Sequence, residues 1–273
     1  MMVQSAPDGG AHFVITMDEH TTFAGLLARA FGNETFEAVA PRDEMLWVVD
    51  YHDRGWQELD AEAALDPKTG LPYNLTQTPF GDIIKTSNKS PSFNQKHHAY
   101  CGLISSMHSW GLYNGRYGMS DHVLLDSIAA ENRGIADSML DDELKRQEEL
   151  KAELAKDTTT AAWVESDHLM QNYKQLQFFD TVALYFNCKH AGIRGEASFE
   201  HVPRSATDDA TIALREEGEG TYSFSPYPFV KDGLELWFTG HYLEPQTKGT
   251  NEDLKKILAA TPVSTQTVRF IAG

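Results

Sequence analysis

The chain has 273 residues, of which 41% are hydrophobic, 11% aromatic and 23% charged, and this composition indicates a folded globular protein. Its 40 acidic and 23 basic residues give a net charge of −17, which repels nucleic acid backbones and anionic lipid surfaces. We therefore expect no nucleic acid polymer and no membrane as a partner, and a small anionic substrate only beside a bound cation.

Signals for export and membrane insertion are weak. We find no charged-then-apolar leader and no apolar run near the roughly 20 residues that span a bilayer. Two cysteines, Cys101 and Cys188, are too few for a disulfide framework. We expect a cytoplasmic protein, and the sequence leaves its oligomeric state open, with a homodimer as one option.

The N-terminal part of the sequence predicts one strand and two helices. A short β-branched run at 12–16 is typical of a strand. Apolar residues spaced by three and four then predict a helix over 18–31, with His20 in its first turn. A second helix is expected over about 41–53, because the proline that begins it suits a first helical turn.

The middle of the sequence predicts a long loop followed by helices. Residues 58–94 are rich in proline, glycine and asparagine, and a loop of this length can form the wall or lid of a site. Helical patterns follow at 94–113 and 121–137. The densely charged segment near 130–160 predicts a solvated helical hairpin that projects from the protein. The more apolar segment 161–188 predicts a central helix.

The sequence pattern changes from helical to strand-like near Gly195. Runs at 221–230, 234–242 and 265–271 have the alternation and aromatic content of strands. We expect these runs to form a small antiparallel sheet, with the strand at 12–16 as a further member.

Four residues from three predicted helices have the side chains of a metal centre. His52 and Asp53 are adjacent at the end of the second helix, His20 lies upstream and Asp180 lies downstream. Two imidazoles and two carboxylates suit zinc, manganese, iron or nickel, and magnesium is a further option. A divalent ion held in this way lowers the pKa of a bound water, which then attacks phosphorus or carbon.

The ordered quartet of His20, His52, Asp53 and Asp180 resembles the ligand set of the HD superfamily of metal-dependent phosphohydrolases. The resemblance implies a mainly α fold, an HD-domain-like helical bundle with a small antiparallel sheet. From the pattern of the whole sequence, we expect a single domain over 1–273. Within it, a helical core would span 12–195, with the charged hairpin near 130–160, and a β-rich lobe would span 196–273.

A closer resemblance is to an uncharacterised family catalogued as domain of unknown function 3891. It rests on the motifs at 52–56, 66–72, 105–108 and 177–180, and covers most of the chain. The family has no established activity, so the resemblance implies none for this chain. The resemblance therefore supports an architecture and not a reaction.

A second set of polar side chains falls on one face of the helix predicted at 94–113. His98, Cys101, Ser105 and His108 are spaced at helical intervals. His98 and His108 can extend the centre to two ions, and His108 can also act on the substrate; alternatively, His98 is exposed and His108 is a hydrogen-bonded core residue. Arg54 is the cation nearest to the quartet, and either binds a substrate phosphate or pairs with a surface carboxylate.

The central helix carries a polar stripe along one face. Tyr173, Gln177, Asp180 and Asn187 share this face, and buried polar groups need partners, which a metal with bound waters can supply. Alternatively, Gln177 and Asn187 form hydrogen bonds to nearby loops.

Three functions are compatible with these residues. We predict a metal-dependent hydrolase, specifically a phosphohydrolase that acts on a small phosphorylated or nucleotide-like molecule through a metal-activated water. The alternatives are a di-iron oxygenase, for which His98 and His108 would supply extra nitrogen ligands, and a non-catalytic sensor that binds a metal or another ligand. A metal centre does not by itself determine the reaction.

Overall fold

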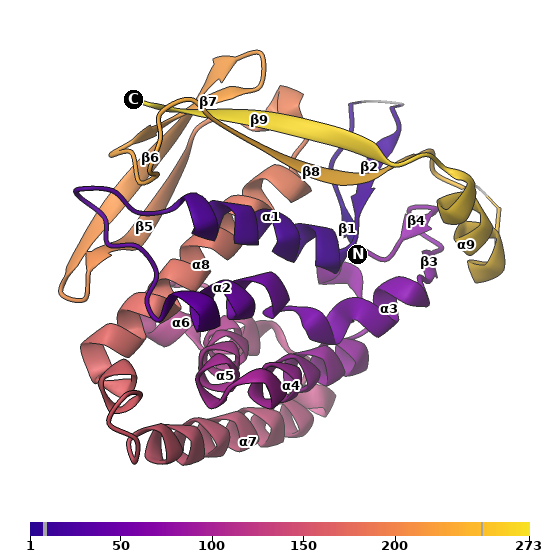
Figure 1. Ribbon diagram of the computed structural model, residues 1–273. Helices are drawn as coiled ribbons and strands as arrows, with labels where there is room; N and C mark the ends of the chain where they lie inside the picture. The colour runs from indigo at the N-terminus through magenta and orange to yellow at the C-terminus, as the bar shows by residue number, and fades with distance from the viewer. Residues whose placement is uncertain (8–9, 247) are drawn as a thin grey trace.

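A curled sheet covers one side of a group of helices in the computed structural model, which describes residues 1–7, 10–246 and 248–273 (Figure 1). Seven strands form the sheet, in the order β1 (Met2–Val3), β2 (His12–Ile15), β8 (Leu234–Leu243), β9 (Ser264–Ala272), β7 (Thr221–Ser225), β6 (Asp208–Gly218) and β5 (Ala197–Ser205). Neighbouring strands are antiparallel except β7 and β9, which run parallel.

The predicted fold class is therefore wrong. The chain is not a mainly α, HD-domain-like helical bundle with a small antiparallel sheet, because a seven-stranded mixed sheet forms a full layer of the structure. Prediction missed β5 and β6, whose exposed positions are largely polar or charged. The strands at 12–16, 221–230, 234–242 and 265–271 are confirmed as β2, β7, β8 and β9, although β7 is shorter than expected.

The helices form the other part of the fold. They are α1 (Met17–Ala30), α2 (Arg42–Tyr51), α3 (Gln57–Ala61), α4 (Phe80–His97), α5 (Ala99–Tyr113), α6 (Gly115–Gly118), α7 (Ala130–Leu154), α8 (Ser166–Cys188) and α9 (Asn251–Ala260). The sheet arches over α1 and α8, whereas α4, α5 and α7 lie on the other side of these two helices (Figure 1). Accordingly, α8 is central, as predicted, and contacts α1, α5 and β5.

The long loop predicted at 58–94 is largely ordered into regular elements. It contains α3, a small hairpin of β3 (Leu65–Asp66) and β4 (Leu71–Pro72), and most of α4. The sequence pattern of the α4 segment predicts a loop because the buried face of this helix is polar. On that face, the Ser90 hydroxyl accepts from the Gly55 amide at 2.9 Å, and the Asn94 amide donates to the Tyr51 carbonyl at 2.9 Å. Hydrophobic periodicity does not detect helices held by such contacts.

The helix predicted at 94–113 is interrupted at His98. This residue has an extended backbone, with φ −155° and ψ 144°, and separates α4 from α5. As a result, the face that was expected to contain His98, Cys101, Ser105 and His108 does not form one continuous helical surface.

The charged stretch near 130–160 is mainly one helix, α7, and does not form a projecting hairpin. Much of the helix predicted at 121–137 belongs to a short 3-10 turn, η3 (Leu124–Ser127), and to the start of α7. Helix α7 packs against α4 and α5 and buries Met139, Leu140, Leu150 and Leu154. Its Arg146 joins the buried Glu143 carboxylate, at 3.0 Å, to Ser92 of α4. The few apolar residues of this charged helix are thus sufficient to pack it against the protein.

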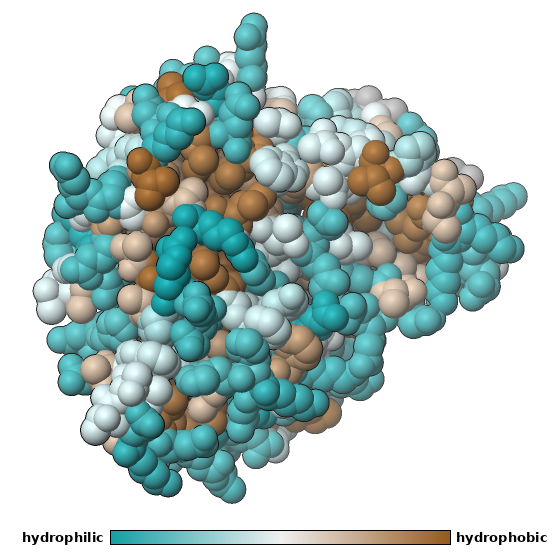
Figure 2. All heavy atoms as spheres, in the orientation of Figure 1, coloured by the Kyte–Doolittle hydropathy of each residue, from teal (hydrophilic) through white to brown (hydrophobic). Residues whose placement is uncertain are grey.

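One main hydrophobic core continues from the helices into the sheet. Phe186 of α8 lies 4.8 Å from the Tyr222 ring and 5.4 Å from the Phe270 ring, measured between centroids. Hydrophilic side chains cover much of the face in Figure 2, with hydrophobic ones in small groups between them. No helix within the described residues has the length and apolar character needed to cross a membrane.

Candidate metal centre

Three helices bring the four predicted ligands together. His20 lies in the first turn of α1, which the Thr16 hydroxyl caps; His52 ends α2, and Asp180 lies within α8. The Asp180 Oδ1 atom is 3.1 Å from His20 Nε2 and 3.7 Å from His52 Nε2. Asp53 Oδ2 also lies 3.7 Å from His52 Nε2. The two histidines have no exposed surface, whereas the Asp53 side chain is 17% exposed.

The outer nitrogens of both histidines are held by acceptor oxygens. His20 Nδ1 donates to Asn187 Oδ1 at 2.9 Å, and His52 Nδ1 donates to the Val49 carbonyl at 2.8 Å. In a neutral imidazole this leaves the Nε2 lone pair directed inward, which is the arrangement found in metal-binding histidines. His52 Nε2 is buried and has no hydrogen-bond partner among the described residues. The site thus presents two ring nitrogens and carboxylate oxygens to one small volume.

Opposite charges dominate the electrostatics of this cluster. Burial lowers the pKa of His52, but the Asp53 and Asp180 carboxylates more than offset this effect and raise its pKa to about 9. Burial raises the pKa of Asp180, yet its contacts with His20 and His52 hold it well below the usual value. The buried carboxylate therefore stays ionised and needs a positive partner, either an imidazolium proton or a cation.

His108 joins the cluster from α5, and its environment keeps it neutral. Potential ligand atoms of His52, Asp53 and His108 lie within 4.8 Å of one another, as do those of His20, His52 and Asp180. Burial, together with the charge on His52, lowers the pKa of His108 to about 4. The Gln177 side-chain amide donates to His108 Nδ1 at 2.7 Å. Because Nδ1 accepts, the single proton of the neutral ring is on Nε2.

His98 does not reach the cluster. Its Nδ1 accepts from the Tyr100 amide at 3.1 Å and caps α5, and its ring lies 5.8 Å from the Trp163 ring. Neither convergent ligand group includes it. The interruption of the helix at this residue moves it away from the face that carries His108. The structure thus leaves His98 out of the candidate ligand set.

Arg54 also has partners outside the cluster. Its guanidinium lies 3.2 Å from Asp18 and over the rings of Tyr51 and Phe93, at 5.8 and 5.4 Å from their centroids. Asp18 is two residues before His20 on α1, so Arg54 links the start of α1 to the turn after α2. This geometry assigns it a positioning contact; a contact with substrate stays a prediction.

The predicted polar stripe of α8 is buried beside the cluster. Asn187 orients His20, and Gln177 orients His108, so two of its members contact candidate site residues directly. The Tyr173 hydroxyl is buried without a hydrogen-bond partner among the described residues. Sequence reasoning missed Arg116, which donates to Thr181 beside Asp180 at 3.0 Å. The only sequence signal for it is its place in a short Gly-flanked turn, 115–118.

Gly55 allows α4 to approach the His52-Asp53 pair closely. A Cβ atom at this position would lie 2.3 Å from the Thr86 carbonyl oxygen, which belongs to the α4 backbone. We expect Gly55→Ala to lower the free energy of unfolding by about 3 kcal/mol, because such overpacking forces the backbone to shift. Urea denaturation measures this change.

Gly81→Ala is the matched control for that substitution. Gly81 also belongs to the α4 region, but a Cβ there has no atom within 4 Å. It should leave stability unchanged or raise it by about 0.5–1 kcal/mol through helix propensity. Equal stability of the two variants would contradict the close approach of α4 to Gly55.

The fold and the cluster define a helical candidate metal centre covered by a mixed sheet. The family model described as Protein of unknown function (DUF3891) matches residues 1–245, and the chain belongs to this family. The match confirms the closer of the two resemblances and gives no support to the HD superfamily. Searches of curated proteins and of solved structures found no match.

Proposed function

We propose that the chain is a metal-dependent hydrolase, and specifically a phosphohydrolase that acts on a small phosphorylated or nucleotide-like molecule. One observation carries the proposal. The Nε2 atoms of His20 and His52 lie 3.1 and 3.7 Å from the same Asp180 oxygen, and each ring donates through Nδ1 to another acceptor. Buried ligand atoms oriented by outer hydrogen bonds are typical of a metal centre.

The available nitrogens favour one ion. His52 occurs in both convergent groups, but its Nδ1 is committed to the Val49 carbonyl, so it offers one nitrogen to one ion. A second ion would keep few protein ligands, and His98 lies elsewhere. This arrangement argues against the di-iron oxygenase. The imidazole nitrogens favour zinc, manganese, iron or nickel over magnesium.

The residues around the ligands have distinct roles in the proposed reaction. A divalent ion bound by His20, His52, Asp180 and Asp53 would lower the pKa of a bound water toward neutrality. His108 stays neutral and directs an Nε2 proton into the cluster, so it can donate a hydrogen bond to a substrate oxygen that gains charge. Asp53 is the most exposed of the candidate ligands, so we place the substrate on its side.

Burial of the cluster limits the substrate and favours a second candidate function. His20, His52, His108 and Asp180 are each at most 3% exposed, which suits a small substrate. A closed centre also suits a metal sensor that binds its ion without turnover. The two functions differ in product release and not in metal content.

The test measures metal content and phosphate release on the same preparations. We expect about one transition metal ion per chain in the wild type, no retained metal in His52→Ala, and weakened binding in Asp53→Ala. Asp50→Asn is the control, because this half-buried carboxylate pairs with Arg29 outside the cluster. Unchanged metal content in both alanine variants would refute the metal centre.

Activity separates the two candidate functions. The wild type, loaded with each candidate metal, should release phosphate from at least one member of a panel of small phosphomonoesters and nucleotides. His108→Ala should retain the metal but lose roughly 100-fold or more in kcat, as is typical when a general acid or charge-stabilising donor is removed. Stoichiometric metal without release of phosphate from any panel member would refute the phosphohydrolase and support the sensor.

A further inference from the structure

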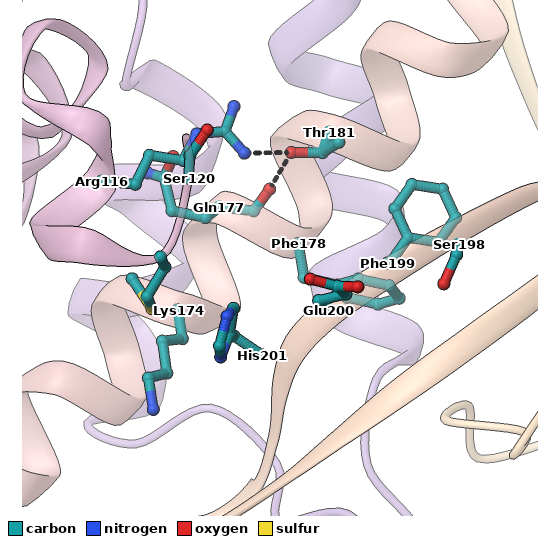
Figure 3. Close-up of a pocket in the computed structure, with 11 residues that line it drawn as sticks. Arg116, Ser120, Lys174, Gln177, Phe178, Thr181, Ser198, Phe199, Glu200 and His201 are labelled. Atoms are coloured by element: carbon teal, nitrogen blue, oxygen red, sulfur yellow. Dashed lines mark hydrogen bonds between the residues drawn. The ribbon is translucent and has the colours of Figure 1, made fainter. Parts of the chain in front are cut away.

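A polar pocket lies beside the candidate metal centre, and we propose that it binds a small oxyanion of the phosphate class. The pocket has a volume of about 220 Å³ and lies between α8, the turn that contains α6, and β5. Figure 3 shows Arg116, Ser120, Lys174, Thr181 and His201 among the residues around it. That the oxyanion is an anionic group of the substrate rests on the proposed function; the binding itself does not.

Arg116 provides the charge for this pocket. Its guanidinium donates to the Thr181 hydroxyl at 3.0 Å, and this hydroxyl donates to the Gln177 backbone carbonyl at 2.6 Å. Within the described residues, Arg116 makes no ion pair with a carboxylate. An uncompensated guanidinium in a chain of net charge −17 is positioned to bind an anion, and its planar fork matches two oxygens of a phosphate.

Backbone strain is concentrated around the same pocket. Four residues other than glycine have positive φ among the described residues, and three of them are Arg116 at 51°, Tyr117 at 59° and His201 at 57°. A left-handed conformation costs roughly 1–2 kcal/mol for a residue with a side chain. Such strain persists where the surrounding structure holds a residue in place, as it commonly does in binding sites. Arg116 and His201 both line the pocket.

The basic side chains on the opposite side of the pocket lie close to a carboxylate. Lys174 Nζ lies 2.5 Å from Asp209 Oδ2, and His201 Nδ1 lies 3.9 Å from the same oxygen. Glu200 adds a further negative charge to the lining. We therefore place the oxyanion on the Arg116 side, beside Thr181 and Ser120. The Asp209 carboxylate limits its affinity.

The pocket is joined to the metal centre through α8. Gln177 lines the pocket and donates to His108, and Thr181 is the next residue after Asp180. An anion bound at Arg116 is therefore one helical turn or less, along α8, from residues of the metal centre. A substrate with two anionic groups can thus be held by the pocket while its reacting phosphate is at the metal centre.

Isothermal titration of metal-free protein with sulfate tests the pocket without the metal. Sulfate should bind to the wild type, and Arg116→Gly should weaken this binding by roughly 10- to 100-fold, as expected for the loss of a charge-assisted hydrogen bond. Glycine is chosen because it tolerates the positive φ at this position, so the substitution removes the guanidinium without adding strain. Asp209→Asn should tighten binding several-fold because it releases Lys174.

Arg133→Ala is the control, since Arg133 is a partly exposed arginine of α7 that pairs with Asp137 away from the pocket. Wild-type sulfate affinity in Arg116→Gly, or equal loss in Arg133→Ala, would overturn the proposal, as would the absence of sulfate binding to the wild type. The metal-content measurements fail or succeed independently of this titration. If the protein binds sulfate through Arg116 but holds no metal, the proposal for the pocket stands and the proposed function is refuted.

Discussion

Replacing Asp180 with asparagine is expected to abolish stoichiometric metal binding and, with it, all metal-dependent phosphate release. Asparagine has nearly the same shape, but it removes the negative charge that both His20 and His52 approach. The remaining ligands would be two neutral imidazoles and the partly exposed Asp53, a set with one carboxylate fewer for a divalent cation. Elemental analysis after dialysis against a limiting amount of zinc or manganese measures the loss.

The same variant should also be less stable when no metal is present. The His52 imidazolium loses one of its two anionic partners. The shift of its pKa corresponds to about 3 kcal/mol of stabilisation from both partners together, so we expect the variant to lose part of that amount through His52. Denaturation of the metal-free variant against the metal-free wild type measures this term. Asp50→Asn again serves as the control. Full metal occupancy in Asp180→Asn would exclude this carboxylate as a ligand.

The grouping of the four candidate ligands was predictable because each of them lies in a segment with a strong local signal. The apolar spacing of the first helix places His20 in its first turn, and the end of the second helix places His52 and Asp53 together. What the sequence does not contain is the outer layer of contacts. The Val49 carbonyl that orients His52 is a backbone atom, so no residue type identifies it.

The sheet was under-predicted because its pairings are remote in sequence. Strand β7 pairs in parallel with β9, so Thr221 lies opposite Arg269, and no short-range pattern encodes that partner. The register of the β5–β6 pair is irregular, and β5 does not alternate strictly between buried and exposed residues. His98 illustrates a different failure. The helical spacing continues through this residue in the sequence, but its side chain caps the next helix instead.

The two histidines with shifted pKa values predict a stability maximum near pH 6.5 for the metal-free protein. The pKa of His52 is raised to about 9 in the folded state, so its contribution is complete below the unfolded value of 6.5 and is lost as the pH rises toward 9. The pKa of His108 is lowered to about 4, so its contribution is complete above 6.5 and is lost as the pH falls toward 4. Each histidine contributes about 3 kcal/mol to the free energy of unfolding when its contribution is complete. Chemical denaturation in the presence of a chelator, from pH 4 to 9, measures the profile.

His52→Gln isolates the loss of stability above pH 6.5, because glutamine does not titrate. The difference in unfolding free energy between wild type and variant should shrink by about 3 kcal/mol between pH 6.5 and 9 without metal. With saturating metal, the same difference in unfolding free energy should instead increase between pH 6.5 and 8. The ion displaces the His52 proton, so it binds more tightly as the proton concentration falls. A difference that is independent of pH without metal would show that His52 does not carry the proton. Parallel slopes with and without metal would show that the ion and the proton do not compete for the same nitrogen.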